Sequence, residues 1–244
     1  MGGMMPATPE VRPLKSYQVS TPRGPVYLQA QNLRPHILMI HGFMRHPAML
    51  EHWCHLIPDL GFINLPGHGG AGDLDEVSLQ AWIEGLDAII DVLEGPPPLL
   101  IGESLGAIAA LGMRARAVIA VDPVLSTHQL WPQSAFFKKM RAKGEPVRPD
   151  FEALFETPFH WILERIRVPT LVLAGDVPLM PQRAGVRLPS LLTDEDLALY
   201  AAHPLVEAMR IPGGHNLLDK NPQGVLEAAG PFIARHGGFS ASRF

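Results

Sequence analysis

The central segment of this 244-residue chain reads Leu99-Leu100-Ile101-Gly102-Glu103-Ser104-Leu105-Gly106-Ala107-Ile108-Ala109-Ala110. An apolar run typical of a buried strand leads into a Gly-x-Ser-x-Gly turn, and an alanine-rich run typical of a helix follows. A serine on so tight a turn takes a strained backbone conformation that exposes its hydroxyl, and Gly102 and Gly106 must be small so that strand and helix can approach. The pattern predicts a nucleophile elbow centred on Ser104, although an ordinary strand-to-helix connection can carry the same five residues.

Strand and helix signals alternate on both sides of this segment. Before it, the pattern predicts a hairpin, a buried strand, a helix, a short strand and an amphipathic helix at residues 15–30, 37–40, 47–57, 62–65 and 78–93. After it, the pattern predicts a strand, a strand, a helix, a strand and a helix at residues 117–121, 169–174, 194–203, 206–211 and 222–235. This alternation predicts an α/β fold with a mostly parallel central sheet and helices on both faces.

Composition favours a single well-buried domain that acts on a small molecule. Hydrophobic residues make up 47% of the chain and charged residues 18%, and a net charge of −4 provides no basic surface for nucleic acid. The single cysteine, Cys54, excludes an internal disulfide, and no residues stand at metal-ligand spacing, so we expect no metal or other cofactor. With no signal peptide and no apolar run of roughly 18 residues, we expect a cytoplasmic protein without a membrane span. The sequence leaves the oligomeric state open.

The alternation is interrupted once. Residues 14–124 and 166–244 form the predicted core, residues 1–13 a loose tail, and residues 125–165 an insertion that would cap the core. The insertion is rich in aromatic residues, which could roof a substrate pocket or form the insertion's own core. The candidate pocket residues are Trp131, Phe136, Phe137, Phe155 and Trp161.

Four polar segments follow predicted strands and should therefore meet at the carboxyl edge of the sheet. They are His41-Gly42-Phe43, Ser104, Gly175-Asp176 and Gly213-Gly214-His215. Serine, acid and histidine in this order resemble the catalytic triad of the α/β-hydrolase superfamily. The resemblance covers nearly the whole chain, and is greatest to the small serine hydrolases with a short cap, such as carboxylesterases and thioesterases.

The chemistry of acyl transfer gives each of these groups a role. A serine hydroxyl is a weak nucleophile at neutral pH, so Ser104 needs a base that takes its proton and returns it to the leaving group, and His215 can do both. A carboxylate on the other ring nitrogen fixes the tautomer, and we assign this role to Asp176. The backbone N–H of Leu105 would stabilise the oxyanion, and the resemblance implies the N–H of Phe43 as the second donor.

The acid is the least determined of these assignments. Asp176 follows Gly175 directly, whereas the family usually leaves two residues between the glycine that ends the strand and the acid. Asp122, Asp194 and Asp196 therefore remain alternatives. We expect Asp122 to anchor a loop, and Asp194 and Asp196 to favour the start of a helix.

These residues predict a serine hydrolase that cleaves an ester or thioester of a small to medium apolar acyl group through an acyl-enzyme. A carbon-carbon bond hydrolase or a cofactor-free perhydrolase with the same triad is one alternative. A ligand receptor on this fold, which keeps the pocket without turnover, is another.

Overall fold

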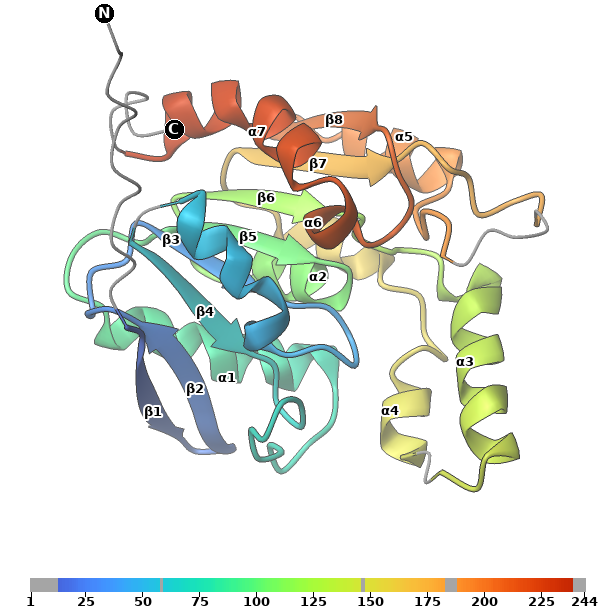
Figure 1. Ribbon diagram of the computed structural model, residues 1–244, viewed down its shortest axis with the longest axis horizontal. Helices are drawn as coiled ribbons and strands as arrows, with labels where there is room; N and C mark the ends of the chain where they lie inside the picture. The colour runs from blue at the N-terminus through green and yellow to red at the C-terminus, as the bar shows by residue number, and fades with distance from the viewer. Residues whose placement is uncertain (1–12, 58, 146–147, 183–187, 239–244) are drawn as a thin grey trace, which may run out of the picture.

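The computed structural model describes residues 13–57, 59–145, 148–182 and 188–238. The tail predicted for residues 1–13 lies outside this part of the chain, apart from Pro13. Within the described residues one sheet has the strand order β1-β2-β4-β3-β5-β6-β7-β8 (Figure 1). The strands are β1 (Lys15–Thr21), β2 (Gly24–Ala30), β3 (Ile37–Ile40), β4 (Leu60–Asn64), β5 (Leu99–Glu103), β6 (Ala117–Val121), β7 (Thr170–Gly175) and β8 (Val206–Ile211).

Strand β2 pairs antiparallel with both β1 and β4, and every pairing from β4 to β8 is parallel. Each residue of β3 to β7 is buried, as expected for strands with a layer of helices on either side. The sheet confirms the predicted α/β fold.

Helices occupy both faces of the sheet. The described α-helices are α1 (Leu79–Val92), α2 (Leu105–Gly112), α3 (Trp131–Ala142), α4 (Pro149–Ala153), α5 (Asp194–Ala201), α6 (Leu217–Lys220) and α7 (Pro222–His236). Three 3₁₀ helices, η1 (Pro47–His55), η2 (Thr127–Gln129) and η3 (His160–Arg165), complete the described elements. None of these helices is long and apolar enough to cross a membrane.

The alternating side chains of the parallel strands divide the core into two layers. Leu38, Leu100 and Val118 pack on the side of α1 and α2. The residues next to them along the strands point the other way and pack against η1, α6 and α7. In Figure 1 these two groups of helices lie in front of and behind the sheet.

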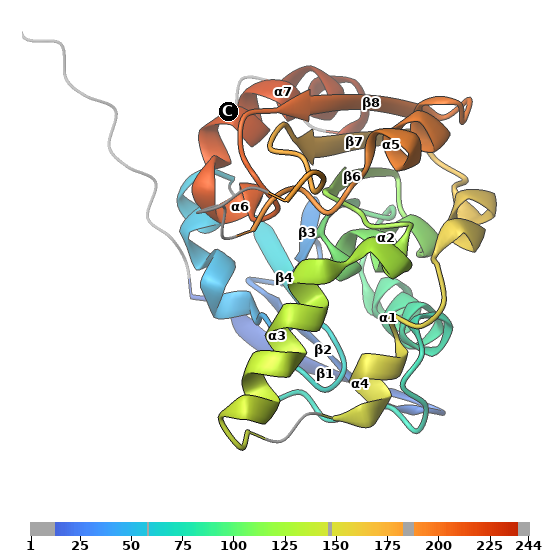
Figure 2. The ribbon, with the colours of Figure 1, turned by 90° about the vertical axis from the view of Figure 1, so that its right-hand side faces the viewer.

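The segment between β6 and β7 holds η2, α3, α4 and η3 in place of a single crossover helix. Helices α3 and α4 stand beyond the carboxyl ends of the parallel strands (Figure 1), and they face the viewer when the molecule is seen from that end (Figure 2). We call residues 125–165, which contain these four helices, the cap.

Candidate active site

Ser104 lies on the turn between β5 and α2, with φ 57° and ψ −122°. This backbone conformation is strained for a residue with a side chain, and it is the conformation expected of a nucleophile elbow. A Cβ at Gly102 would overlap the backbone of Gly106 and Ala107, and a Cβ at Gly106 would overlap the carbonyls of Ile40 and His41 at the end of β3. The two glycines therefore let α2 start directly above the strand end.

Ser104 and His215 border the same cavity, which has a volume of about 380 Å³. Both residues are nearly buried, with 8% and 7% of their surface exposed. The cavity opens at the carboxyl ends of the strands. Its lining comes from the loop after β3, the elbow, the loops after β7 and β8, and helices η1, α3 and α6. The predicted gathering of Ser104 and His215 at this edge therefore occurs.

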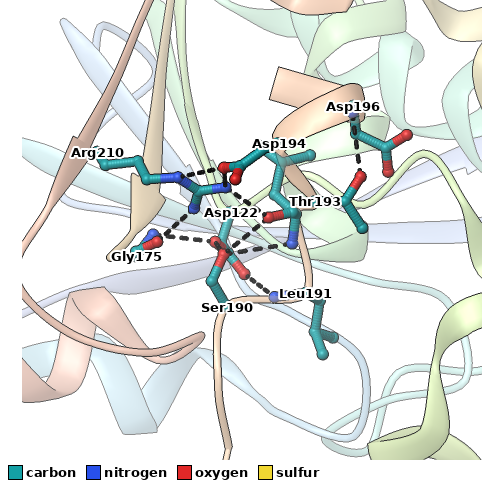
Figure 3. Close-up of polar contacts among 9 residues, drawn as sticks. Asp122, Gly175, Ser190, Leu191, Thr193, Asp194, Asp196 and Arg210 are labelled. Carbon is teal, nitrogen blue, oxygen red and sulfur yellow. Dashed lines mark hydrogen bonds and ion pairs between the residues drawn. The ribbon is translucent and has the colours of Figure 1, made fainter. Parts of the chain in front are cut away.

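The Nδ1 atom of His215 lies 2.6 Å from Oδ2 of Asp122, a residue that is 0% exposed. Three further donors surround the same carboxylate: the Gly175 N–H at 3.1 Å and the Ser190 hydroxyl at 2.5 Å on Oδ1, and the Leu191 N–H at 2.7 Å on Oδ2. Figure 3 shows these last three groups converging on Asp122. The four donors hold the carboxylate in place and satisfy its oxygens in a dry environment.

Asp122, rather than Asp176, therefore contacts His215, and the expected pairing of Asp176 with His215 is wrong. Asp176 is exposed, and its Oδ1 accepts a hydrogen bond of 2.9 Å from the Gly213 N–H. Its side chain thus braces the turn ahead of His215 from the outer side. The other two candidates are also elsewhere: Asp194 pairs with Arg210 (Figure 3), and Asp196 accepts from Ser126 in the cap.

The path of the loop after β8 explains this arrangement. The loop turns back across the end of β7, where a Cβ at Gly175 would overlap the Gly213 and Gly214 carbonyls. It is held there by the N–H of His215, which donates to the Leu188 carbonyl at 3.2 Å. His215 is thereby carried past β7 to the end of β6, where Asp122 is the first residue after the strand.

The two residues predicted to donate to the oxyanion, Leu105 and Phe43, both belong to segments next to Ser104. Leu105 is the first residue of α2, so its N–H has no carbonyl partner within the helix. Phe43 lies in the loop after β3, and it borders the cavity beside Gly42. His41 supports this loop from below: its Nδ1 bonds to the Gly42 carbonyl at 2.9 Å, and burial lowers its pKa to about 4. The ring is therefore neutral near pH 7 and donates from Nδ1 while its Nε2 accepts from a backbone N–H.

The cap aromatics divide into one rim residue and a packed cluster. Phe136 borders the cavity and is 37% exposed. Phe137 and Phe155 instead pack against the Phe43 ring, with centroids 6.1 and 5.1 Å away. Trp131 donates to the Leu179 carbonyl, and Trp161 borders a separate depression with Val77.

Four of the five candidate pocket residues are thus absent from the cavity lining. The cavity wall instead contains apolar residues that sequence analysis did not select, namely Met44, Met49, Pro132, Leu188 and Leu191. The basic residues of α3, namely Lys138, Lys139 and Arg141, do not border the cavity. Arg141 pairs with Glu152, and the two lysines are exposed.

A buried ionic cluster lies beside Ser104, and sequence analysis did not identify it. Arg45 Nε lies 3.3 Å from Glu103 Oε2, and Arg45 Nη2 donates to Asp219 Oδ1 at 2.8 Å. The side chain of Glu103 is 1% exposed and that of Arg45 11% exposed. Burial raises the pKa of Glu103, while the charges of Arg45 and His215 act in the opposite direction. The sequence signal for this cluster was a glutamate inside an otherwise apolar strand-to-helix segment.

Comparisons with known proteins identify the family of this chain. Residues 37–235 match the model of the alpha/beta hydrolase family. A search of curated proteins found no match. An esterase from Pyrococcus furiosus is similar in structure, with a TM-score of 0.71, 16% identity, and coverage of 98% of this chain and 96% of that one.

Two further solved structures are similar. An E-2-(acetamidomethylene)succinate hydrolase has a TM-score of 0.67 and 17% identity, and the match covers 90% of this chain and 99% of that one. A thioesterase domain from the curacin biosynthetic pathway has a TM-score of 0.60 and 17% identity, and the match covers 88% of this chain and 99% of that one. At such identities the structural likeness shows the fold, and the family match shows the membership. The chain belongs to the alpha/beta hydrolase family and is a hydrolase of that family.

Proposed function

We propose that this protein is a serine hydrolase that cleaves an ester or thioester of a small to medium apolar acyl group through an acyl-enzyme. The observation that carries the proposal is the position of His215, which borders the cavity of Ser104 on one side and bonds to the buried Asp122 on the other. The names of two similar structures, an esterase and a thioesterase domain, agree with this bond class.

In the proposed mechanism His215 takes the proton of Ser104 as the hydroxyl oxygen attacks the carbonyl carbon. Asp122 holds the other ring nitrogen, which fixes the tautomer and stabilises the imidazolium. The N–H groups of Phe43 and Leu105 stabilise the oxyanion, and each such donor contributes about 3 kcal/mol to lowering the barrier. The tetrahedral intermediate then expels the alcohol or thiol, which receives the proton from His215.

The same histidine serves the second half of the reaction. It takes a proton from water as the water oxygen attacks the acyl-enzyme, and it returns that proton to the Ser104 oxygen when the acid leaves. The products are the free acid and the regenerated serine.

The lining of the cavity supports an apolar acyl group. The apolar part of its wall consists of methionine, proline, phenylalanine and leucine residues, and a volume of about 380 Å³ accommodates a group of modest size. The charge of Arg45 is already paired with Glu103 and Asp219, so this cation is not free to bind an anionic group on the acyl chain.

The experiment that tests the proposal is intact-mass analysis after treatment with a fluorophosphonate, applied to the wild type and to Ser104→Ala. We expect one adduct on the wild type and none on the variant. An unlabelled wild type, under conditions that label a control hydrolase, would contradict the proposal and favour a ligand receptor on this fold.

A panel of chromogenic esters and thioesters of increasing acyl length then identifies the substrate class. We expect turnover that rises and then falls with chain length as the acyl group fills the cavity. A wild type that is labelled by the fluorophosphonate but turns over none of these compounds would favour carbon-carbon bond hydrolysis or perhydrolysis by the same triad.

A further inference from the structure

Arg45 connects the three segments that carry the proposed catalytic groups. It lies two residues after Phe43 in the loop that follows β3. Glu103, one of its partners, directly precedes Ser104. Asp219, the other partner, lies in helix α6, which begins two residues after His215.

The loop that carries Phe43 is a strained turn. The Arg45 N–H donates to the Gly42 carbonyl at 3.3 Å, which closes a turn over residues 42–45. Inside this turn Met44 has φ 58°, a left-handed conformation that is unfavourable for a side-chain-bearing residue. Strained turns persist only where surrounding contacts hold them. The ion pairs of Arg45 are such contacts.

The stem of Arg45 runs close to the nucleophile. A Cβ at Gly42 would lie 3.2 Å from Ser104 Cβ and 3.6 Å from Arg45 Cδ, so the arginine stem and the serine flank the same glycine. From there the guanidinium reaches Glu103 through Nε and Asp219 through Nη2. The contact with Glu103 is an ion pair and the contact with Asp219 a hydrogen-bonded one. A planar guanidinium presents its N–H groups in fixed directions and can face two carboxylates at once, whereas a lysine ammonium is a single point charge.

A buried ion pair is by itself weak evidence for stability, because desolvation of the charges offsets their attraction. Glu103 carries this penalty in full, since its side chain is 1% exposed. A cluster of this kind is better explained by the geometry that it fixes. Here the cluster links the 42–45 turn, the elbow and the start of α6.

We propose that Arg45 is a positioning residue: by pairing with Glu103 and Asp219 together, it holds the 42–45 turn so that the Phe43 N–H faces the reacting carbonyl beside Ser104. This inference rests on the proposed function. It follows that Arg45 acts on turnover and on the rate of serine acylation, and not on substrate affinity.

The test compares R45K and the double variant R45M/E103Q with the wild type. R45K keeps the positive charge but loses the planar set of guanidinium N–H donors. The double variant removes both charges together and leaves no unpaired charge at Glu103, while Asp219, whose side chain is 26% exposed, is in contact with water. R114M is the matched control, because Arg114 pairs with Asp87 and Asp91 on the surface far from the cavity.

Three quantities are measured for each protein: the thermal unfolding midpoint, kcat and KM on the best ester of the panel, and the rate constant of fluorophosphonate inactivation. We expect kcat and the inactivation rate to fall about 100-fold in R45M/E103Q and at least about tenfold in R45K, as for a weakened oxyanion donor. We expect KM to stay within about threefold, and R114M to match the wild type.

A folded R45M/E103Q or R45K with wild-type kcat overturns the inference, and so does a variant whose KM rises while kcat is unchanged. If the double variant does not fold, the kcat and KM of R45K alone test the inference in the same way. An unlabelled wild type contradicts the proposed function itself, whereas a labelled wild type with unaffected variants contradicts the role of Arg45 alone.

Discussion

Asp122 combines a strained backbone with an unusually complete set of hydrogen-bond donors. Its φ is 49°, in the left-handed region that residues with a side chain seldom occupy. Its carboxylate accepts from the backbone N–H groups of Gly175 and Leu191, from the hydroxyl of Ser190 and from His215. These bonds hold the strained residue and aim one carboxylate oxygen at His215.

The exchange of Asp122 for asparagine tests this role. An amide offers one acceptor oxygen in place of two, so it cannot satisfy all four donors, and it favours the wrong tautomer of His215. We expect D122N to lower kcat about 10⁴-fold, measured with a chromogenic ester. The matched control is D176N, since Asp176 braces the Gly213 turn from an exposed position. A D176N variant that loses as much activity as D122N would contradict the assignment.

His41 makes folding stability depend on pH. Its ordinary pKa of 6.5 in the unfolded chain falls to about 4 in the folded protein, because the buried ring disfavours a positive charge. The unfolded chain therefore binds the proton first as pH falls, and the stability present above pH 6.5 is lost progressively toward pH 4.

We expect this group to reduce the free energy of unfolding by about 2 kcal/mol between pH 7 and pH 5. Urea unfolding of the wild type and of H41Q at both pH values measures it. Glutamine can still donate to the Gly42 carbonyl and does not titrate, so the variant should lose correspondingly less stability on acidification. Equal losses in the two proteins would show that another group causes the pH dependence, for example His68, whose pKa is also lowered by burial.

At the scale of elements, the site depends on one crossing of backbones. The loop after β8 passes over the end of β7 with glycine on both sides of the contact, and it thereby delivers His215 to the end of β6. The end of β7 is therefore covered by backbone, and an acid placed there points outward, as Asp176 does.

Gly175→Ala tests the crossing. The added methyl group meets backbone atoms of Gly213 and Gly214, which cannot move aside as a flexible side chain could. We expect a loss of about 1 to 3 kcal/mol in unfolding free energy, together with a reduced rate of fluorophosphonate labelling because His215 is displaced. Gly72→Ala is the control, since an added Cβ there meets nothing within 4 Å. A fully active G175A would show that the loop tolerates the shift.

The sequence alone predicts the strands and the elbow, because uninterrupted apolar runs and paired glycines are local signals. The runs at Ile37–Ile40 and Leu99–Ile101 are indeed adjacent strands in the sheet. The partner of His215 was harder to predict, since it depends on which strand end a distant loop crosses. The direct succession Gly175-Asp176 argued against Asp176 as the partner of His215, because the two residues that usually separate the glycine from the acid are missing. The four donors around Asp122 come from three separate segments, which no spacing rule connects.

In the cap, too, the sequence does not predict which side chains of a helix face the cavity. Phe136 and Phe137 are neighbours in sequence with the same side chain, yet one borders the cavity and the other is 5% exposed against Phe43. Composition identified the aromatic residues, and only packing against the core determines which of them face the substrate.

Across the whole molecule, the cap is anchored to the core by an aromatic cluster. Phe151 of the cap stacks on the His68 ring, with centroids 5.1 Å apart, and also contacts Phe43 and Trp82. Phe136 contacts the Phe137 ring, with centroids 5.7 Å apart, and lies at the cavity rim.

A pair of alanine variants separates these two roles. We expect F151A to lose about 3 kcal/mol or more of unfolding free energy because it empties a buried site, measured by urea unfolding. We expect F136A to retain most of its stability, since Phe136 is 37% exposed, and to shift the preferred acyl length in the ester panel. An F151A variant as stable as F136A would contradict the anchoring role of the cluster.

The position of Phe43 has a consequence for any attempt to alter substrate preference. The side chain of Phe43 contacts the rings of Phe137, Phe151 and Phe155 in the cap, and the residue also borders the cavity that Ser104 lines. In the proposed mechanism, Phe43 therefore both packs against the cap and donates to the oxyanion. A cap transplanted from a relative would have to reproduce these ring contacts as well as supply a new rim. Without the ring contacts, we expect the chimaera to lose activity because Phe43, the proposed oxyanion donor, is displaced.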